Sequence, residues 1–449
     1  MSKQRIQLSD HFTYSRLLRF VLPCIGTMLF TSIYGIVDGL CVSNFVGKTA
    51  FAAVNLIMPL PMLLGTIGFM LGTGGSAIVG ITLGEGDQKK ADRYFTLFLL
   101  AALISVSVLA VLGIVFLRPI AVLLGAKGEL LDYAVRYGRI LMVSLPTFAL
   151  QNMFQSFFVT AEKPHLGFWF TVGAGCTNMV LDVLMVGIWG WGVEGAAIAT
   201  FISQLVGGVL PVFYFIDRSN SSRLHLCKTS FYSKVLRDAC INGSSELMTN
   251  LSMSLVNILY NYQLLRLAGE NGVAAYGVIM YAAFLFVAVF VGYAVGSAPI
   301  VSFHYGARNH AEVHNLYQKS LRLIAVVAVT LTLASMFIIP CVARIFVGYD
   351  AELLALTSRA FRLYALSFLI MGFNVYASSF FTALGDGVTS ALISFLRTLA
   401  FQVIAILLLP LLLGIDGIWL AVTAAELAAL AVSAAMLLTK DKVFHYRKA

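Results

Sequence analysis

Two aspartates, each with a polar residue four positions earlier, lie within long apolar segments of this chain. Asp38 follows Tyr34 in TSIYGIVDGL, and Asp182 follows Asn178 in TNMVLDVLMVG. A spacing of four places both members of a pair on one face of a helix. A carboxylate in mid-membrane costs at least about 2.5 kcal/mol, so such a residue is a functional candidate. Two carboxylates facing one cavity disfavour each other's charged form, which is the chemistry of proton uptake and release.

The same residue types would also suit Na⁺, which prefers hard oxygen ligands. The residues therefore leave H⁺ and Na⁺ open as the bound ion. A structural alternative is that both aspartates only cap or pair inside the protein, which requires a deep cation nearby. The arginines in or beside the spans of the first half all lie near the ends of these spans, at Arg16, Arg19, Arg93, Arg118, Arg136 and Arg139. Their position favours an ion site.

The elements that must position these aspartates are membrane-spanning helices. The chain is 59% hydrophobic and 11% charged, whereas soluble domains carry about 25% charged residues. Apolar runs of about 20 residues, long enough to cross a membrane, recur along it. Helices are expected, because lipid offers no hydrogen-bond partner to an open strand edge. The predicted spans are roughly 16–40, 51–83, 94–117, 131–160, 166–188, 194–216, 238–265, 273–303, 317–339, 353–384, 388–412 and 417–438.

The second half of the chain repeats the first at an offset of 222 residues. Gly84 pairs with Gly306, and GVEG at Gly192 pairs with GIDG at Gly414. Six spans per copy is an even number, so both copies enter the membrane from the same side. The predicted fold class is therefore an all-α polytopic membrane protein, with twelve transmembrane helices in two six-helix bundles related as parallel repeats.

The repeat fails at the two aspartates. Asp38 falls opposite Tyr260, and Asp182 falls opposite Ile404. The candidate ion site is therefore expected in the first half alone.

The chain is predicted to form an N-lobe (1–216), a polar basic linker (217–236) and a C-lobe with a short basic tail (237–449). With the N-terminus inside, most of the 30 lysines and arginines fall on the inner side. This bias predicts a multi-pass protein of the cytoplasmic (inner or plasma) membrane with both termini in the cytoplasm. The net charge of +9 then reflects topology and attraction to anionic lipid, and not binding to nucleic acid.

Nothing in the sequence predicts an enzyme, a metal centre or a cofactor. The six cysteines form no CxxC pair, so a disulfide or metal framework is not expected. No Ser/His/Asp order, HExxH motif or phosphate loop is present. An integral membrane enzyme would need a polar catalytic cluster near a membrane interface, and the sequence shows none. A transporter of the major facilitator architecture would carry Gly-x-x-x-Asp-Arg-x-Gly-Arg in its first cytoplasmic loop. The loop GEGDQKKADR is charged but does not have that order.

Four segments of the chain form a recognisable set: Pro23 followed by YGIVDGLCVSNFVG, GSAIVGITLGEGDQKKADR, YGRI from Tyr137, and TNMVLD followed by GVEGAAIAT. With this set, the chain resembles the multidrug and toxic compound extrusion (MATE) family of polyspecific cation antiporters, over essentially all 449 residues. The chain is similar to the DNA-damage-inducible and staphylococcal multidrug branch. Its eighth span lacks the acidic residues of the vibrio branch, and its seventh has only Glu246.

The resemblance implies an ion-coupling site made of Asp38, Asn178, Asp182 and Thr200, with Tyr34 and Tyr137 beside it. It also implies alternating access of two lobes, with export of cationic or amphiphilic small molecules in exchange for H⁺ or Na⁺. No cofactor is expected, the expected partners are small-molecule substrates and membrane lipid, and the protein is expected to be a monomer. The same-superfamily alternative is a flippase for lipid-linked oligosaccharide or polysaccharide. It would need several cavity arginines for a pyrophosphate, and only Arg397 lies deep in a span.

The C-half has three charged residues within its predicted spans, Glu246, Arg397 and Glu426. They form either an internal ion-pair network or a cavity in which Glu246 attracts a cationic substrate or a second proton. The chain's 33 Phe, 18 Tyr and 15 Met residues suit an adaptable cavity for organic cations. The candidate cavity residues are Glu246, Gln151, Asn152, Gln155, Met58, Met62 and Met280.

Pro23 precedes Asp38 in the first predicted span. A proline within a helix produces a kink. Pro23 is therefore the candidate hinge, and we expect protonation of Asp38 to change the bend of this span.

Overall fold

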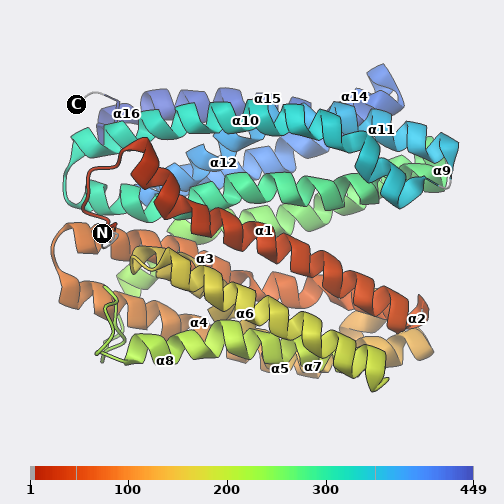
Figure 1. Ribbon diagram of the computed structural model, residues 1–449, viewed down its shortest axis with the longest axis horizontal. Coiled ribbons are helices and arrows are strands. Elements are labelled where there is room, and N and C mark those ends of the chain that lie inside the picture. The colour runs from red at the N-terminus through yellow and green to blue at the C-terminus, as the bar shows by residue number, and fades with distance from the viewer. Residues whose placement is uncertain (1–5, 47, 349, 448–449) are drawn as a thin grey trace.

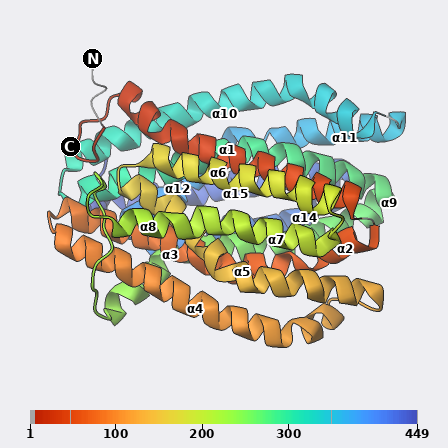
Figure 2. The same cartoon turned by 60° about the horizontal axis from the view of Figure 1, so that its bottom comes forward.

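The protein consists of twelve membrane-spanning helices in two six-helix bundles, as the sequence predicts. The structure is a computed structural model that describes residues 6–46, 48–348 and 350–447, and all regular secondary structure in these ranges is helical. Figures 1 and 2 show the first bundle, from α1 to α8, beside the second, from α9 to α16, with α1 running diagonally between them. We call these bundles the N-lobe and the C-lobe.

The N-lobe begins with the long helix α1 (Tyr14–Phe45). The predicted span 51–83 is interrupted, because Pro59 starts a new helix where its missing N–H costs nothing. Asp87 caps α4 by accepting a hydrogen bond from the Lys90 N–H. The other helices of this lobe are α2 (Lys48–Ile57), α3 (Pro59–Gly84), α4 (Gln88–Leu123), α5 (Glu129–Thr160), α6 (Pro164–Asp182), α7 (Gly192–Gln204) and α8 (Leu210–Ile216).

The C-lobe begins with α9 (Ser233–Gly306), which turns back on itself at Gly269 (φ 60°) and so supplies the seventh and eighth spans. Asp350 and Asp386 cap the helices that follow them. The other helices are α10 (His310–Val347), α11 (Ala351–Ala365), α12 (Phe368–Ala383), α13 (Gly387–Phe395), α14 (Phe401–Leu413), α15 (Ile415–Thr439) and α16 (Asp441–Phe444).

Three short π-helical segments interrupt the spans. Val183–Ile188 (η1) continues α6, Leu205–Val209 (η2) joins α7 to α8, and Leu396–Ala400 (η3) joins α13 to α14. The first begins directly after Asp182, and the third contains Arg397. Single π turns occur often at functional sites, because they rotate the side chains that follow.

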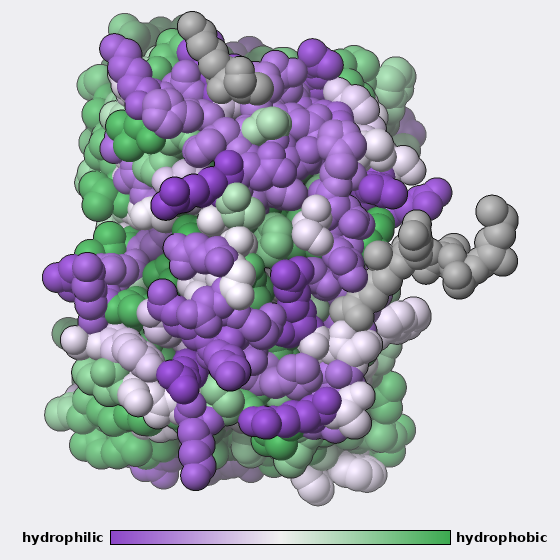
Figure 3. Space-filling model, turned by 90° about the vertical axis from the view of Figure 1, so that its left-hand side faces the viewer, coloured by the Kyte–Doolittle hydropathy of each residue, from purple (hydrophilic) through white to green (hydrophobic). Residues whose placement is uncertain are grey.

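Both chain ends lie at the same end of the molecule (Figure 1), which we call the terminal face. This face is mainly hydrophilic, and apolar residues cover the flanks (Figure 3). Large apolar side chains such as Leu123, Phe337 and Leu412 are more than three-quarters exposed, as expected for side chains that contact lipid. By length and composition alone, nine helices of the described ranges could cross a membrane, or ten with the pair α11 and α12, bent by 46°. This number is below twelve because α9 is counted once although it supplies two spans, and because α5 is not included.

Candidate functional site

The N-lobe brings the predicted ion-site residues together between α1 and α6. These two helices pack side by side, and Asp38 of α1 meets Asp182 and Asn178 of α6. Asp182 is fully buried, and Asn178 is 2% exposed. Tyr34 and the buried Tyr137 lie within electrostatic range of Asp38.

Asp38, Asp182 and Asn178 lie close enough to interact with one another, but four of their polar atoms have no hydrogen bond of ordinary geometry. Both carboxylate oxygens of Asp182, Oδ1 of Asp38 and Nδ2 of Asn178 are buried and have no partner among the described residues. Within that part of the chain, no ion pair reaches either aspartate. An uncompensated buried carboxylate costs several kcal/mol. The donor set, two carboxylates and an amide, therefore fits a bound proton or a small hard cation.

Thr200 occupies α7, the helix that packs against α6. Its hydroxyl donates to the carbonyl oxygen of Ala196 over 3.0 Å, so its lone pairs stay available as acceptors. The structure thus places Thr200 on a helix that packs against the helix of Asp182. The hydrogen bond described for its hydroxyl stays within α7 and does not reach the aspartates.

The C-lobe contains a cavity of about 400 Å³. This volume falls in the usual range for small-molecule sites, about 300–1,000 Å³. Its walls come mainly from α9, α11, α12, η3 and α15, and Met28, Thr73 and Ser156 of the N-lobe close one side. The charged residues of its described lining are Glu246, Arg397 and Glu426.

Arg397 and Glu426 form a buried ion pair. Arg397 Nη1 donates to Glu426 Oε1 over 3.3 Å, and Glu426 is 1% exposed. Glu246 lines the same cavity, but its carboxylate takes part in no described hydrogen bond or ion pair. The structure thus contains features of both sequence interpretations, a structural pair and a carboxylate facing the cavity.

The other predicted cavity residues are dispersed. Met280 lines the cavity, and Gln155 lines a small pocket beside it. Gln151 is buried against Gly207, and Asn152 is buried with Nδ2 unpartnered. Met58 packs on the core around α2 and α5, and Met62 is exposed.

The sequence analysis missed an aromatic wall of the cavity. Tyr260 and Tyr276 stack with ring centroids 4.9 Å apart and ring planes 11° apart. The Tyr276 hydroxyl donates to Asn257 Oδ1 over 2.7 Å. The repeat could have predicted this wall, because Tyr260 occupies the repeat position of Asp38, and the cavity residue Val422 that of Thr200.

The lobes meet most tightly at the terminal face, where α3 crosses α9. A Cβ atom added at Gly74 would overlap the backbone of Ala239, and one at Gly243 would overlap Met70. Small residues permit this close approach.

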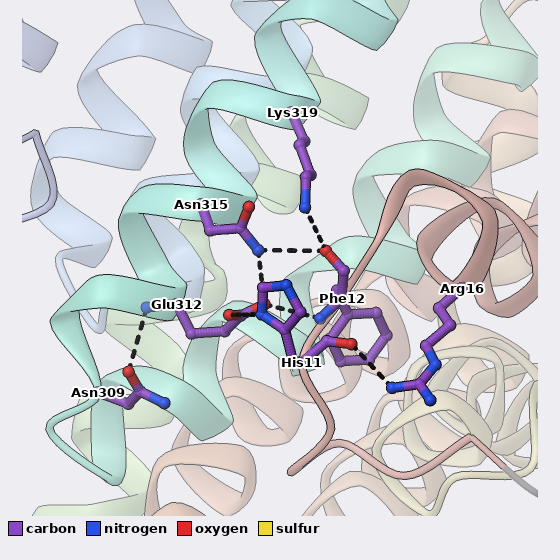
Figure 4. Close-up of polar contacts among 7 residues, drawn as sticks. All are labelled: His11, Phe12, Arg16, Asn309, Glu312, Asn315 and Lys319. Carbon is purple, nitrogen blue, oxygen red and sulfur yellow. Dashed lines mark hydrogen bonds and ion pairs between the residues drawn. The ribbon is translucent and has the colours of Figure 1, made fainter.

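An N-terminal segment, residues 6–13, ties the lobes together at the same face, and we call it the strap. Leu8 and Phe12 are fully buried. The Leu8 N–H donates to Glu162 of the N-lobe over 2.9 Å, and the Phe12 N–H donates to Glu312 of the C-lobe over 2.8 Å. Figure 4 shows Glu312 and its helix neighbours reaching the backbone of Phe12. The contacts are His11 Nδ1 to Glu312 (2.6 Å), Asn315 Nδ2 to the Phe12 carbonyl (3.1 Å) and Lys319 Nζ to the same carbonyl (2.6 Å).

Pro23 lies inside α1, which stays helical through it. The Thr27 hydroxyl donates to the Pro23 carbonyl oxygen over 2.9 Å. The predicted hinge is thus a buried proline in the helix that carries Asp38.

Two repeated helical lobes, with a buried carboxylate pair in one and a drug-sized cavity in the other, define a duplicated polytopic membrane protein. Residues 23–184 and 247–408 each match the MatE family model. The chain belongs to this family, which confirms the resemblance seen in the sequence.

Relatives cover nearly the whole chain. The chain is 21% identical over 436 residues to the multidrug export protein MepA of Staphylococcus saprophyticus. This alignment covers 96% of this chain and 95% of MepA. A solved structure of MATE in complex with MaL6 superposes with a TM-score of 0.92 at 22% identity, and covers 100% of both chains. The outward-facing conformation of a multidrug resistance MATE transporter of the MOP superfamily superposes with a TM-score of 0.91 at 23% identity, also over 100% of both chains. These relatives are named as export proteins and transporters, not as enzymes.

Proposed function

We propose that this protein is a secondary active antiporter. It exports organic cations or other amphiphilic drugs across the cytoplasmic membrane in exchange for H⁺ or Na⁺. The observation that carries the proposal is the pair Asp38 and Asp182, two carboxylates that face each other with buried oxygens and with no cationic side chain paired to them among the described residues. The multidrug export function named for MepA supports the substrate class.

The ion-coupling site consists of Asp38, Asn178, Asp182 and Thr200, with Tyr34 and Tyr137 beside it. Ion uptake removes the charge repulsion between the carboxylates. Because α1 carries Asp38 and packs against both α6 and α9, a change in α1 reaches the C-lobe directly. In this cycle the ion binds in the N-lobe, drug leaves the cavity, the lobes rock, and the ion leaves on the other side.

The terminal face is the cytoplasmic side in this proposal. Lysine and arginine residues concentrate in the segments that reach this face, and the face itself is hydrophilic (Figure 3). The units are the N-lobe (1–216), the linker (217–236) and the C-lobe (237–449). The protein acts as a monomer in membrane lipid, without a cofactor.

Transport by the purified protein in liposomes, under separately imposed H⁺ and Na⁺ gradients, tests this function. Wild-type protein should move rhodamine 123, a cationic dye, under one of the two gradients. Asp38→Asn and Asp182→Asn should each abolish gradient-driven transport. Asp132→Asn changes an exposed aspartate of the same lobe and should transport normally. Wild-type coupling in both site variants would refute the N-lobe mechanism.

The flippase alternative is less well supported. A lipid-linked pyrophosphate would need several arginines that line one cavity. Arg397 is the arginine of the described lining, and it is already paired with Glu426.

A further inference from the structure

We propose that the strap and the end of the linker form a reciprocal clasp. The clasp holds the two lobes together at the terminal face and must be released before the lobes can separate there. The first arm is the strap, residues 6–13, and the second arm is residues 228–235, which we call the linker arm. This inference rests on the proposed function, because the proposed cycle requires the lobes to rock against each other.

The strap has both ends on the N-lobe and its middle on the C-lobe. It runs directly into α1, and its Leu8 N–H donates to Glu162 of the N-lobe over 2.9 Å. His11 and the Phe12 N–H instead contact the carboxylate of Glu312, in the first turn of α10. If the C-lobe moves away from the N-lobe at this face, the contacts to α10 must therefore break.

The C-lobe holds the backbone of the strap with side chains of α10. Lys319 Nζ and Asn315 Nδ2 both donate to the Phe12 carbonyl oxygen, and Glu312 Oε1 accepts from the Phe12 N–H over 2.8 Å (Figure 4). Asn309 caps α10 by accepting a hydrogen bond from the Glu312 N–H, and so fixes the turn that carries Glu312. Both backbone groups of Phe12 are thus satisfied without secondary structure, which docks this segment in one register.

Phe12 also fills an apolar site between the lobes. Its side chain is fully buried. Its ring packs edge-on against Phe20 of α1 and His304 of α9, with ring centroids 6.1 Å and 6.4 Å away. Release of the strap would expose this ring, and also the fully buried side chain of Leu8. Burial of apolar surface therefore opposes the release.

The linker arm is the repeat counterpart of the strap and lies on the opposite lobe. It leads into α9 of the C-lobe but contacts α4 of the N-lobe, and α4 is the repeat counterpart of α10. Thr229 Oγ1 donates to the Arg93 carbonyl oxygen over 2.8 Å. The Tyr232 ring packs edge-on against Tyr94, with ring centroids 5.4 Å apart. Arg93 is the repeat position of Asn315, so both arms meet the same turn of equivalent helices.

The two arms are therefore exchanged between the lobes. Each lobe extends the segment before its first helix onto the other lobe, and separation at this face must release one arm or both. The strap is the stronger arm, because Leu8 and Phe12 are fully buried, whereas Thr229 and Tyr232 are only half-buried. The strap is accordingly the arm to weaken first.

Distances across the terminal face test the clasp. Spin labels on Lys89→Cys and Ala311→Cys, in a cysteine-free background, report the separation of the first turns of α4 and α10 by pulsed electron paramagnetic resonance. Leu8→Ala/Phe12→Ala removes the buried side chains of the strap. We expect a longer distance to be at least about tenfold more populated than in the wild type, because two large apolar side chains leave the contact between the lobes.

A matched variant controls for the loss of apolar side chains. Leu123→Ala/Phe337→Ala removes the same two residue types from positions that are more than three-quarters exposed, and should leave the distance unchanged. Tyr232→Ala, in the linker arm, should cause a smaller shift alone and should increase the shift when it is combined with the strap variant.

A reversible cross-link tests the clasp without removing its buried side chains. The side chains of His11 and Glu312 touch at 2.6 Å, so His11→Cys/Glu312→Cys can be joined by a short bifunctional methanethiosulfonate. Gradient-driven transport of rhodamine 123 should fall at least about tenfold on joining, and should return when the cross-link is reduced. His314→Cys/Gln318→Cys, joined by the same reagent within α10, should transport normally, because these neighbours belong to one helix.

The outcomes separate this inference from the proposed function. An unchanged distance in Leu8→Ala/Phe12→Ala, or full transport by the protein with the strap joined to α10, would overturn the clasp. If Leu8→Ala/Phe12→Ala does not yield folded protein, the cross-link alone decides. If wild-type protein moves rhodamine 123 under neither gradient, the antiport function fails instead, and the distances still decide the clasp.

Discussion

Gly84 and Gly306 occupy the same position in the two halves of the chain, and each lies against the other half's helix at the terminal face. A Cβ atom at Gly84 would overlap the carbonyl oxygen of Phe303, and one at Gly306 would overlap the carbonyl oxygen of Ile81. Ile81 and Phe303 are themselves repeat positions of each other. The pseudo-twofold axis that relates the lobes therefore passes through this crossing of α3 and α9.

The crossing predicts a conformational effect of alanine at either glycine. Gly84→Ala or Gly306→Ala should force the helices apart and destabilise the contact between the lobes at the terminal face by about 1–3 kcal/mol. Spin labels can be attached to Lys89→Cys and Ala311→Cys in a cysteine-free background. The distance between the two labels, measured by pulsed electron paramagnetic resonance, should be longer in either alanine variant than in the protein with both glycines.

A glycine from α9 provides the control for this experiment. A Cβ atom at Gly277 would meet nothing within 4 Å. Gly277→Ala should therefore leave the distance unchanged and stabilise the helix by about 0.5–1 kcal/mol. An unchanged distance in both Gly84→Ala and Gly306→Ala would show that the crossing does not set the conformation.

The strap predicts a specific pattern of amide protection. Glu312→Ala removes the acceptor for the Phe12 N–H and for His11. Hydrogen exchange in peptide 6–13 should become at least about tenfold faster, as mass spectrometry can measure. Glu352→Ala, at an exposed position of α11, should leave this peptide protected. If protection survives in Glu312→Ala, the strap does not depend on the Glu312 carboxylate.

The sequence predicts the architecture far better than the cavity. Apolar runs and the repeat give the number of spans because lipid constrains every spanning segment in the same way. Which face of a helix points inward depends on its rotation against its neighbours, so Gln151 and Met62 could not be placed from composition. The π-helical turn at Arg397 likewise depends on packing. The strap was not predicted either, because Leu8 and Phe12 stand among polar residues and become buried only when both lobes are present.

Asp386 predicts a pH-dependent contribution to C-lobe stability. It lies between α12 and α13, where burial opposes ionisation, but hydrogen bonds from Lys440 and Thr389 outweigh burial and lower the pKa of Asp386. A lowered folded-state pKa gives stability that is present above the unfolded pKa of about 3.9 and is lost as the pH falls through the folded pKa.

Lys440→Gln should therefore lower the Tm at pH 7, and this difference from wild type should shrink below about pH 4. Because Lys440 is more than a third exposed, the loss should stay below about 1 kcal/mol. Lys442→Gln, at an exposed neighbouring position, should leave the Tm unchanged. A Tm difference for Lys440→Gln that is independent of pH would assign the effect to packing of the lysine stem.

Replacing Pro23 should impair transport without preventing ion binding. Proline lacks the N–H that would bond to the Arg19 carbonyl, so Pro23→Ala restores a hydrogen bond and should straighten α1. Because α1 packs against α9 as well as α6, a rigid α1 should slow the lobe movement and lower gradient-driven transport at least about tenfold. Binding of the coupling ion at Asp38, measured by calorimetry in detergent, should persist.

Pro119→Ala makes the same change at an exposed position inside α4 and should transport normally. Full gradient-driven transport by Pro23→Ala would remove the hinge from the mechanism and leave the ion site to act through other contacts of α1.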